Sequence, residues 1–278
     1  MEAVKKRKVG VVGATGMVGQ RFLTLLAEHP WFEVVALAAS GRSAGKTYEE
    51  AVGDRWKLSV PMPEKYRNMV MIDASDVRAM AEKCSFVFCA VNMPKEEIRA
   101  LEEAYAKAEI PVVSNNSANR WTPDVPMVIP EINDAHLAVI AHQRKRLGTT
   151  RGFIAVKPNC SIQSYVPALT PLLPYGITEV VATTYQAISG AGKTFREWPE
   201  MIDNVIPYIG GEGEKSEGAA SRLGTRGKRG DRQGTGSADY DAVYPGPGDR
   251  RTHCRGICPL PRKADKKCHF GGVETVCR

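Results

Sequence analysis

Short apolar runs alternate with helix-like patterns along the first half of the chain. We predict strands at the apolar runs, which are residues 8–12, 34–38, 70–72, 86–91, 111–114 and 127–129. Apolar residues recur with helical spacing between these runs, as at residues 95–107 and 135–146. Alternating strands and helices favour an α/β domain built on a parallel, doubly wound sheet. We therefore expect residues 1–152 to form one such domain.

A second domain is expected to begin at residue 153. Its elements are predicted at residues 153–156 (strand), 162–173 (helix) and 180–186 (strand). The turn between the first strand and the helix carries Asn159 and Cys160. Unpaired N–H groups at a helix N terminus favour the thiolate form of a cysteine, and a thiolate is able to attack a carbonyl group. Cys160 is therefore a candidate nucleophile, with a buried structural cysteine as the alternative.

Glycines follow the first predicted strand, in the order Gly13-Ala14-Thr15-Gly16-Met17-Val18-Gly19. Glycines let a backbone turn tightly and approach the pyrophosphate of a dinucleotide, which binds at the N terminus of the next helix. The spacing G-x-x-G-x-x-G is a variant of the usual G-x-G-x-x-G. We interpret residues 13–18 as cofactor-binding, with a plain tight turn as the alternative.

The end of the second predicted strand is polar but not acidic. Sites for NAD usually place Asp or Glu there to bind the ribose 2′-hydroxyl. This chain has Ser40, Arg42 and Ser43 instead. Hydroxyl groups and a guanidinium suit a 2′-phosphate, so the sequence predicts NADP, with a solvated loop as the alternative.

Five motifs occur in one order along the chain. They are the glycine loop at 13–19, Ser-Asn-Asn-Ser-Ala-Asn-Arg at 114–120, Ile-Pro-Glu-Ile-Asn at 129–133, Asn-Cys-Ser at 159–161 and Gln-Ala-Ile-Ser-Gly-Ala-Gly at 186–192. Together they resemble aspartate-semialdehyde dehydrogenase, in the form found in archaea and fungi. The resemblance covers roughly residues 7–215.

The resemblance implies an N-terminal Rossmann-type domain and an incomplete α+β catalytic and dimerisation domain at residues 153–215. It also implies NADPH-dependent reduction of L-4-aspartyl phosphate to L-aspartate 4-semialdehyde, in the biosynthesis of lysine, threonine, methionine and isoleucine. The intact family member is expected to be a homodimer or homotetramer.

Roles for single residues follow from the same resemblance. Cys160 is implied as the nucleophile, preceded by Asn159 in the catalytic turn, and Gln186 as the residue that orients the substrate. The implied anchors for substrate and phosphate are Arg120, Glu212 and Lys215. The turn that carries Ser189 and Gly190 is expected near the nicotinamide.

Three other interpretations stay open. A malonyl-CoA reductase has the same cysteine and the same scaffold. Glu212 suits a substrate that carries an amine, and so it favours aspartyl phosphate over malonyl-CoA. An N-acetylglutamyl-phosphate reductase fits less well, because that family favours Gly-Cys-Tyr-Pro around the nucleophile. An inactive product that binds NADP is the interpretation from a different class.

The chain changes character after Lys215. Nearly all of its net charge of +7 comes from residues 216–278, which are rich in Gly, Pro and Arg and show neither strand nor helix periodicity. We expect a disordered tail there. We expect no nucleic-acid binding, because the basic charge belongs to this tail and not to the enzyme-like part.

The codons of residues 245–255 indicate a shift of reading frame. Read one base later, with synonymous third bases chosen freely, they can encode Arg-Val-Pro-Val-Ile-Asp-Gly-His-Thr-Ala-Glu. The resembled family has a strand with Arg-Val-Pro-Val, then Gly and His, which supplies a substrate-binding arginine and the catalytic histidine. We predict that the reading frame shifts between Lys215 and Gly218. The 278-residue chain would then lack this histidine and be inactive.

Cysteines in the predicted tail have the close spacing of metal ligands. They are Cys254, Cys258, Cys268 (next to His269) and Cys277. A shifted frame produces cysteines without selection for metal binding, so we expect no metal. We expect a cytoplasmic protein without a signal peptide or a membrane helix, because no stretch approaches about 20 apolar residues and a reactive Cys160 requires reducing conditions.

Overall fold

The computed structural model describes residues 5–175, 177, 180, 182–206, 209–210, 212–223, 267–270 and 273–276. Its strands are β1 (Arg7–Val12), β2 (Phe32–Ala39), β3 (Ile72–Asp73), β4 (Phe86–Cys89), β5 (Val112–Ser114), β6 (Ile154–Val156), β7 (Lys267–Phe270) and β8 (Val273–Val276). Its α-helices are α1 (Met17–Leu26), α2 (Tyr48–Val52), α3 (Glu64–Arg67), α4 (Val77–Lys83), α5 (Lys95–Lys107), α6 (Pro130–Asn133), α7 (Ile140–Leu147), α8 (Ile162–Leu169) and α9 (Glu212–Leu223).

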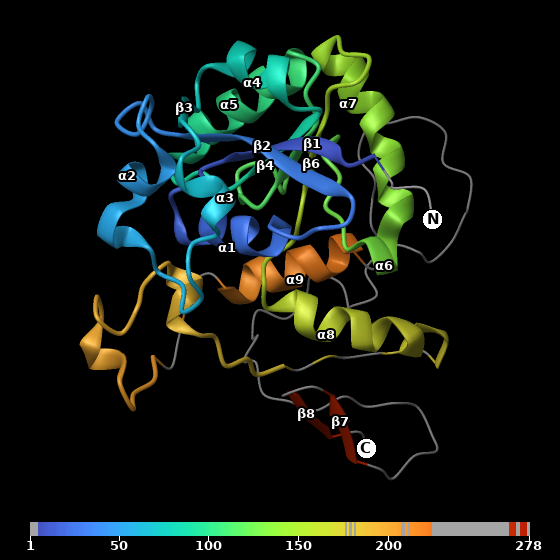
Figure 1. Cartoon of the computed structure of the whole chain (residues 1–278). Coiled ribbons are helices and arrows are strands. Elements are labelled where there is room, and N and C mark those ends of the chain that lie inside the picture. The colour runs from blue at the N-terminus through green and yellow to red at the C-terminus, as the bar shows by residue number, and fades with distance from the viewer. Residues whose placement is uncertain are drawn as a thin grey trace. The chain divides into compact units, whose positions relative to one another are not determined.

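Six parallel strands form the main sheet, in the order β3-β2-β1-β4-β5-β6. Helix α1 lies on one face of this sheet, and α4 and α5 lie on the other (Figure 1). The strand order reverses between β1 and β4, the place where open α/β sheets bind ligands outside the carboxyl ends of their strands. The doubly wound Rossmann-type sheet predicted from the alternating pattern is confirmed.

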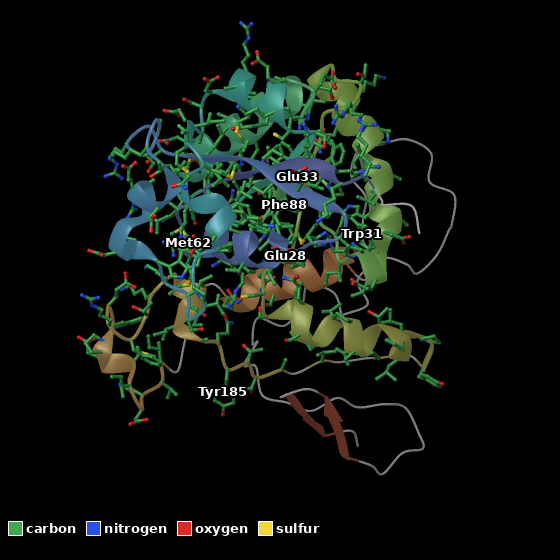
Figure 2. All side chains as sticks on the ribbon, viewed as in Figure 1. Glu28, Trp31, Glu33, Met62, Phe88 and Tyr185 are labelled. Carbon is green, nitrogen blue, oxygen red and sulfur yellow. The ribbon has the colours of Figure 1, made fainter. Side chains whose placement is uncertain are left out.

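The core of the sheet is formed by the apolar runs that predicted the strands. Val9, Val11 and Val87 are fully buried, as expected for central strands covered on both faces. Phe88 of β4, labelled in Figure 2, is partly buried and stacks on Phe22 of α1, with ring centroids 5.0 Å apart. Burial of these side chains is the main force that holds α1 against the sheet.

Residues 127–129 were predicted to form a strand, and this prediction is wrong. Met127 forms only an isolated bridge, and Val156 N of β6 donates to the carbonyl before it, Pro126 O, at 2.9 Å. Asn133 binds two other backbone groups of the segment: Met127 O accepts from Asn133 Nδ2 at 2.9 Å, and Ile129 N donates to Asn133 Oδ1 at 2.9 Å. The ring of His136 also contacts Met127 O, at 3.1 Å. The Asn133 side chain thus takes two backbone groups that a longer strand would pair with its neighbour.

Contacts divide the chain into two units. The first consists of Met1–Pro126, Ala138–Lys157 and Ile188–Pro199, and the second of Met127–Leu137, Pro158–Ala187 and Glu200–Arg278. The sequence placed the boundary between residues 152 and 153. The structure places it after Lys157, because β6 pairs with β5 and so belongs to the main sheet.

The second unit departs from the sequence prediction in three places. Helix α8 ends at Leu169 and continues as a 3₁₀ helix at Thr170–Tyr175, a stretch that includes Pro171 and Pro174, which lack the N–H needed to extend an α-helix. Residues 182–186, predicted as strand, form no regular element. Helix α9 extends to Leu223, although no element was expected after Lys215.

Strands β7 and β8 pair in antiparallel fashion within the segment predicted to be a disordered tail. Most of that segment, including residues 224–266, lies outside the described residues. No helix in the part of the chain that the structure describes is long and apolar enough to cross a membrane.

Candidate active site and cofactor loop

The glycine loop joins β1 to α1 at the carboxyl edge of the sheet. Gly13 has φ +89°, and a Cβ atom there would lie 2.5 Å from Ala90 O. A Cβ atom on Gly19 would lie 2.2 Å from Gly13 O. Both positions therefore require glycine, one for its backbone conformation and for space and the other for space alone. Gly16 is different, since a Cβ there would find ordinary contacts.

The N terminus of α1 is open for an anion. Gly16 is its N-cap residue, and no side chain caps the helix. The first backbone N–H groups of a helix have no intrahelical acceptor, and they attract phosphate oxygens. The loop of residues 13–18 therefore fits the pyrophosphate of a dinucleotide.

The loop after β2 presents hydroxyl groups and one guanidinium. Ser40 and Arg42 are exposed, whereas Ser43 is buried and donates its N–H to Ser40 O at 2.8 Å. The exposed hydroxyl of Ser40 and guanidinium of Arg42 suit a 2′-phosphate, and the assignment of this loop to the cofactor stays a prediction. An acid that sequence reasoning missed is close by: a Cβ on Gly41 would lie 2.8 Å from Asp73 Oδ2 at the end of β3. Hydrogen bonds from Ser75 lower the pKa of Asp73, so this carboxyl is ionised at neutral pH.

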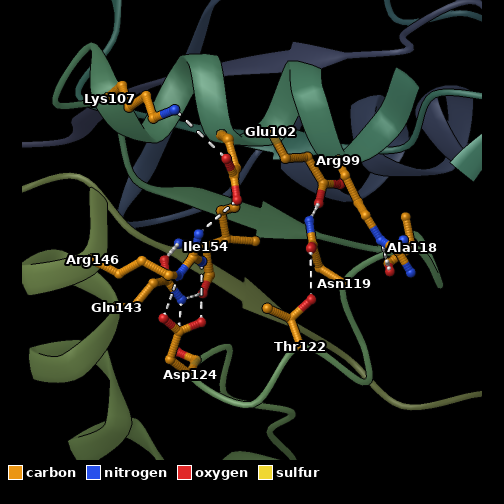
Figure 3. Close-up of polar contacts among 11 residues, drawn as sticks. Arg99, Glu102, Lys107, Ala118, Asn119, Thr122, Asp124, Gln143, Arg146 and Ile154 are labelled. Carbon is orange, nitrogen blue, oxygen red and sulfur yellow. Dashed lines mark hydrogen bonds and ion pairs between the residues drawn. The ribbon is translucent and has the colours of Figure 1, made fainter. Parts of the chain in front are cut away.

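The loop after β5 is anchored to a buried carboxylate. Glu102 of α5 is fully buried. Its two oxygens accept hydrogen bonds from Ser114 Oγ at 2.5 Å, Asn116 Nδ2 at 3.0 Å and Asn119 Nδ2 at 2.8 Å. Figure 3 shows Asn119 between Glu102 and Thr122, whose hydroxyl donates to Asn119 Oδ1 at 3.0 Å.

Arg120 lies at the end of this anchored loop. Its Nε donates to Lys157 O at 3.0 Å and its Nη2 approaches Asn115 O at 3.4 Å. Both acceptors are backbone carbonyls in the first unit, so the guanidinium is tied to the carboxyl edge of β5 and β6. No feature of the sequence alone identifies Glu102 as the anchor, because helix α5 is rich in Glu and burial selects one of them.

Cys160 belongs to the second unit and precedes α8. Its side chain is exposed, and Sγ lies 3.9 Å from Gln186 Oε1. The N-cap residue of α8 is Ser161, which makes no capping bond to the helix backbone. The structure thus brings the predicted nucleophile and Gln186 together, beside an open helix N terminus.

A polar cluster lies next to Cys160. Glu212 Oε1, at the start of α9, accepts from Asn159 Nδ2 at 3.1 Å, from Ser161 Oγ at 2.9 Å and from Gln186 Nε2 at 3.5 Å. Ser216 Oγ lies 2.9 Å from Asn159 Nδ2. Glu212 is therefore the centre of a network that links the turn before α8 to the first turn of α9.

Asn159 is the most constrained member of this cluster. Its Nδ2 lies within hydrogen-bonding distance of three oxygens, the closest being Ser161 Oγ at 2.6 Å. Its Oδ1 is buried and has no hydrogen-bond donor among the described residues. Ser161 and Ser216 complete the cluster; sequence reasoning missed their roles, because hydroxyls next to a motif carry no distinctive spacing.

The remaining predicted residues are placed separately. Lys215 is exposed on α9. Ser189 and Gly190 lie in the 3₁₀ helix Ile188–Ala191, which belongs to the first unit together with the glycine loop. Cys254, Cys258 and Cys277 lie outside the described residues.

A comparison with known proteins assigns the chain to a family. Residues 8–140 match the family model described as the NAD binding domain of semialdehyde dehydrogenase. The chain is 43% identical over 226 residues to the aspartate-semialdehyde dehydrogenase of Aspergillus fumigatus, covering 80% of this chain and 60% of the relative. It is 45% identical over 210 residues to that of Methanothermobacter thermautotrophicus, covering 75% and 58%.

The chain is similar over most of its length to the aspartate-semialdehyde dehydrogenases of fungi and archaea. The crystal structure of the Candida albicans aspartate-semialdehyde dehydrogenase with NADP resembles it with a TM-score of 0.67 and 36% identity, over 79% of this chain and 60% of that one. The fungal and archaeal relatives confirm the family type that the motifs predicted. The chain spans about 60% of the length of the fungal relative it matches.

Proposed function

We propose that this chain carries the cofactor-binding and nucleophile-bearing parts of an NADP-dependent aspartate-semialdehyde dehydrogenase. The observation that carries the proposal is the cluster around Cys160, where an exposed thiol adjoins Gln186 and a carboxylate-centred network. The family assignment supports the substrate, which is L-4-aspartyl phosphate in the reductive direction.

The first unit is proposed to bind NADP. Backbone N–H groups of Met17 and Val18 would hold the pyrophosphate, and Ser40, Arg42 and Ser43 would hold the 2′-phosphate. Asp73 would accept from an adenosine ribose hydroxyl near Gly41. When bound, NADPH supplies a hydride.

The second unit is proposed to form an acyl-enzyme. The Cys160 thiolate attacks the acyl carbon of aspartyl phosphate, the bond from this carbon to the phosphate oxygen breaks, and phosphate leaves with the bonding electrons. The product is a thioester on Sγ. Backbone N–H groups at the start of α8 would stabilise the oxyanion, because they are uncapped and point along the helix axis.

Gln186 and Glu212 are proposed to orient the substrate. Gln186 lies against Sγ, so its amide is placed to bind the substrate carboxylate beside the reacting carbon. Glu212 has the charge that suits an α-ammonium group, and Arg120 and Lys215 suit the phosphate. A malonyl-CoA reductase is the alternative, and it requires no partner for an ammonium group.

Acylation of Cys160 tests the function without requiring complete turnover. The full chain is mixed with L-4-aspartyl phosphate or with malonyl-CoA, and the adduct is located by intact mass and peptide mapping. We expect an aspartyl adduct on Cys160, lost in the Cys160→Ser variant. A malonyl adduct alone would favour the alternative, and no adduct from either substrate would contradict both.

Cofactor choice is tested by binding. We expect the chain to bind NADPH at least about ten-fold more tightly than NADH, since one charged contact is worth roughly 1.5–3 kcal/mol. The Arg42→Ala variant should lose most of this preference and keep its affinity for NADH. Equal affinities for the two cofactors in the wild-type chain would contradict the assignment to NADP.

A further inference from the structure

A polar connection joins the glycine loop to a segment more than a hundred residues away in sequence. The segment is Ile188–Pro199, which belongs to the first unit although the residues on both sides of it belong to the second. Lys57 holds this segment: its Nζ donates to Gly192 O at 2.8 Å and to both oxygens of Glu197, at 2.8 and 2.9 Å.

The backbone of Lys57 is itself fixed from the side of the glycine loop. Gln20 of α1 is fully buried, and its Oε1 accepts from Lys57 N at 2.8 Å. Its Nε2 donates to Thr15 O at 3.0 Å and to Arg55 O at 2.8 Å. Both ends of this amide are satisfied, so the glycine loop and Lys57 are held in one arrangement.

The segment that Lys57 holds is a closed turn. Gly192 has φ +71° and donates its N–H to Ser189 O at 2.9 Å. Glu197 also accepts from Thr194 N at 3.0 Å and from Thr194 Oγ1 at 3.1 Å. Lys57 therefore binds the turn at two points. One is the carbonyl of Gly192 at the C-terminal end of the turn, and the other is the carboxylate of Glu197, which orders the residues after the turn.

We propose that Lys57, supported by Gln20, is a positioning residue that fixes the Ser189–Gly192 turn relative to the glycine loop and thereby raises the affinity for the nicotinamide half of the cofactor. This inference rests on the proposed NADP function. Both members of the Lys57–Glu197 ion pair are needed to fix the turn, because Glu197 orders the turn and Lys57 connects it to α1. The Lys57 side chain is 23% exposed and that of Glu197 is 45% exposed, so either can be replaced without opening the core.

Simple attraction between Lys57 and the cofactor phosphates makes a different prediction. Removal of the Lys57 charge weakens NADPH binding on either account. Removal of the Glu197 charge distinguishes the two accounts. If Lys57 only attracts the phosphates, the less neutralised Lys57 would strengthen NADPH binding. If Lys57 positions the turn, loss of the ion pair would weaken NADPH binding. Conversely, Lys57→Arg keeps the charge and both kinds of hydrogen bond.

The test is a titration of the full chain with NADPH, followed by its fluorescence, and with 2′,5′-ADP, which lacks the pyrophosphate and nicotinamide. We expect Lys57→Met and Glu197→Gln each to weaken NADPH binding about three- to ten-fold, as a partly exposed charged contact would. Binding of 2′,5′-ADP should not change, and Lys57→Arg should restore most of the NADPH affinity. The matched control is Lys65→Met, which removes an equally charged partner from the Lys65–Glu28 pair, 3.1 Å apart in the same unit.

A second readout does not depend on the cofactor. Limited trypsin digestion should cut after Lys193 or Arg196 several-fold faster in Lys57→Met than in the wild-type chain. Tighter NADPH binding by Glu197→Gln, or unchanged cleavage in Lys57→Met, would overturn the inference. A wild-type chain that shows no NADPH binding would contradict the proposed function and the cofactor role of Lys57 together, while the digestion pattern would still separate a gripped turn from a free one.

Discussion

At the scale of single residues, exposure separates Cys160 from Cys84 and Cys89. Cys160 is exposed, whereas Cys84, at the end of α4, and Cys89, at the end of β4, are buried. Burial raises the pKa of Cys84 to about 11, and it raises the pKa of Cys89 as well. The buried thiols are therefore protonated at neutral pH and out of reach of a reagent.

This difference predicts the outcome of alkylation. Iodoacetamide at pH 8 should label Cys160 at least about ten-fold faster than Cys84 or Cys89, since the thiolate is the nucleophile. Peptide mapping by mass spectrometry measures the three sites separately, and the same reaction in guanidinium chloride is the control in which the difference should vanish. Labelling of Cys89 as fast as Cys160 would contradict the buried position of β4.

The motifs predicted some of the residues around Cys160 and not others. Asn159, Gln186 and Glu212 were named from the motifs, and the structure brings them together. Ser161 and Ser216 were not, because their importance comes from the oxygens they meet and not from their own spacing. The same holds for Gln20, whose role becomes visible only when both ends of its amide are found to be paired.

At the scale of elements, helix α5 organises two loops at the edge of the sheet. Its middle presents Glu102 to the Asn116–Asn119 loop. Glu109, two residues after the helix ends, accepts from the backbone N–H groups of Thr150 at 2.8 Å and Gly152 at 2.7 Å. One loop leads to Arg120 and the other to β6. A separate prediction follows for each of the two carboxylates, Glu102 and Glu109.

Glu102→Gln should destabilise the first unit by about 2 kcal/mol, because an amide N–H would face the donors of the loop and leave buried groups unsatisfied. The matched control is the next residue on the same helix: Glu103 pairs with Arg146 at 2.8 Å and is partly exposed, so Glu103→Gln should cost less than about 1 kcal/mol. Urea unfolding followed by tryptophan fluorescence measures both. Equal losses would show that Glu102 does not anchor the loop.

Glu109 predicts a pH dependence. Hydrogen bonds from the backbone of Thr150, Gly152 and Arg151 lower the pKa of its carboxyl from 4.5 to about 2. An acid with a lowered pKa stabilises the folded state above its unfolded pKa, and this stabilisation is lost as the pH falls from 4.5 through about 2.

Removing the Glu109 carboxylate should reduce the fall in stability of the folded chain at acid pH. The urea midpoint of Glu109→Gln should lie below that of the wild-type chain at pH 6, and the two should converge as the pH approaches 2. Glu96→Gln, near the other end of α5, is the control and should leave the pH dependence unchanged. A gap that stays constant down to pH 2 would contradict the role of the ionised carboxyl.

At the scale of the whole molecule, we predict that the C-terminal part decides whether the chain turns over. The proposed acyl transfer uses Cys160, yet the catalytic histidine that the resemblance implies is found only when the codons of residues 245–255 are read one base later. We predict that the 278-residue chain binds NADPH without reducing aspartyl phosphate. A gene in which one base near codons 215–218 is added or removed, so that the shifted frame is read, should yield a longer and active enzyme.

Resequencing across codons 210–260 and an assay of both products measure this prediction. Phosphate-dependent reduction of NADP by L-aspartate 4-semialdehyde should appear only with the shifted-frame product. The matching control is its Cys160→Ser variant, which should be inactive. Turnover by the 278-residue chain itself would show that residues outside the shifted motif supply the proton transfer.

Periodicity in the sequence determined the alternating strands and helices, the positions of five of the strands in the main sheet and both ends of α5, because local spacing reports which side chains face a core. Motif order determined the family and the cluster around Cys160. Tertiary structure alone decided that residues 127–129 form no strand beyond a bridge at Met127, since Asn133 binds two of their backbone groups, and that Ile188–Pro199 returns to the first unit through Lys57. The reason is physical: which of several similar polar side chains becomes buried, and what it meets there, depends on residues far away in the chain.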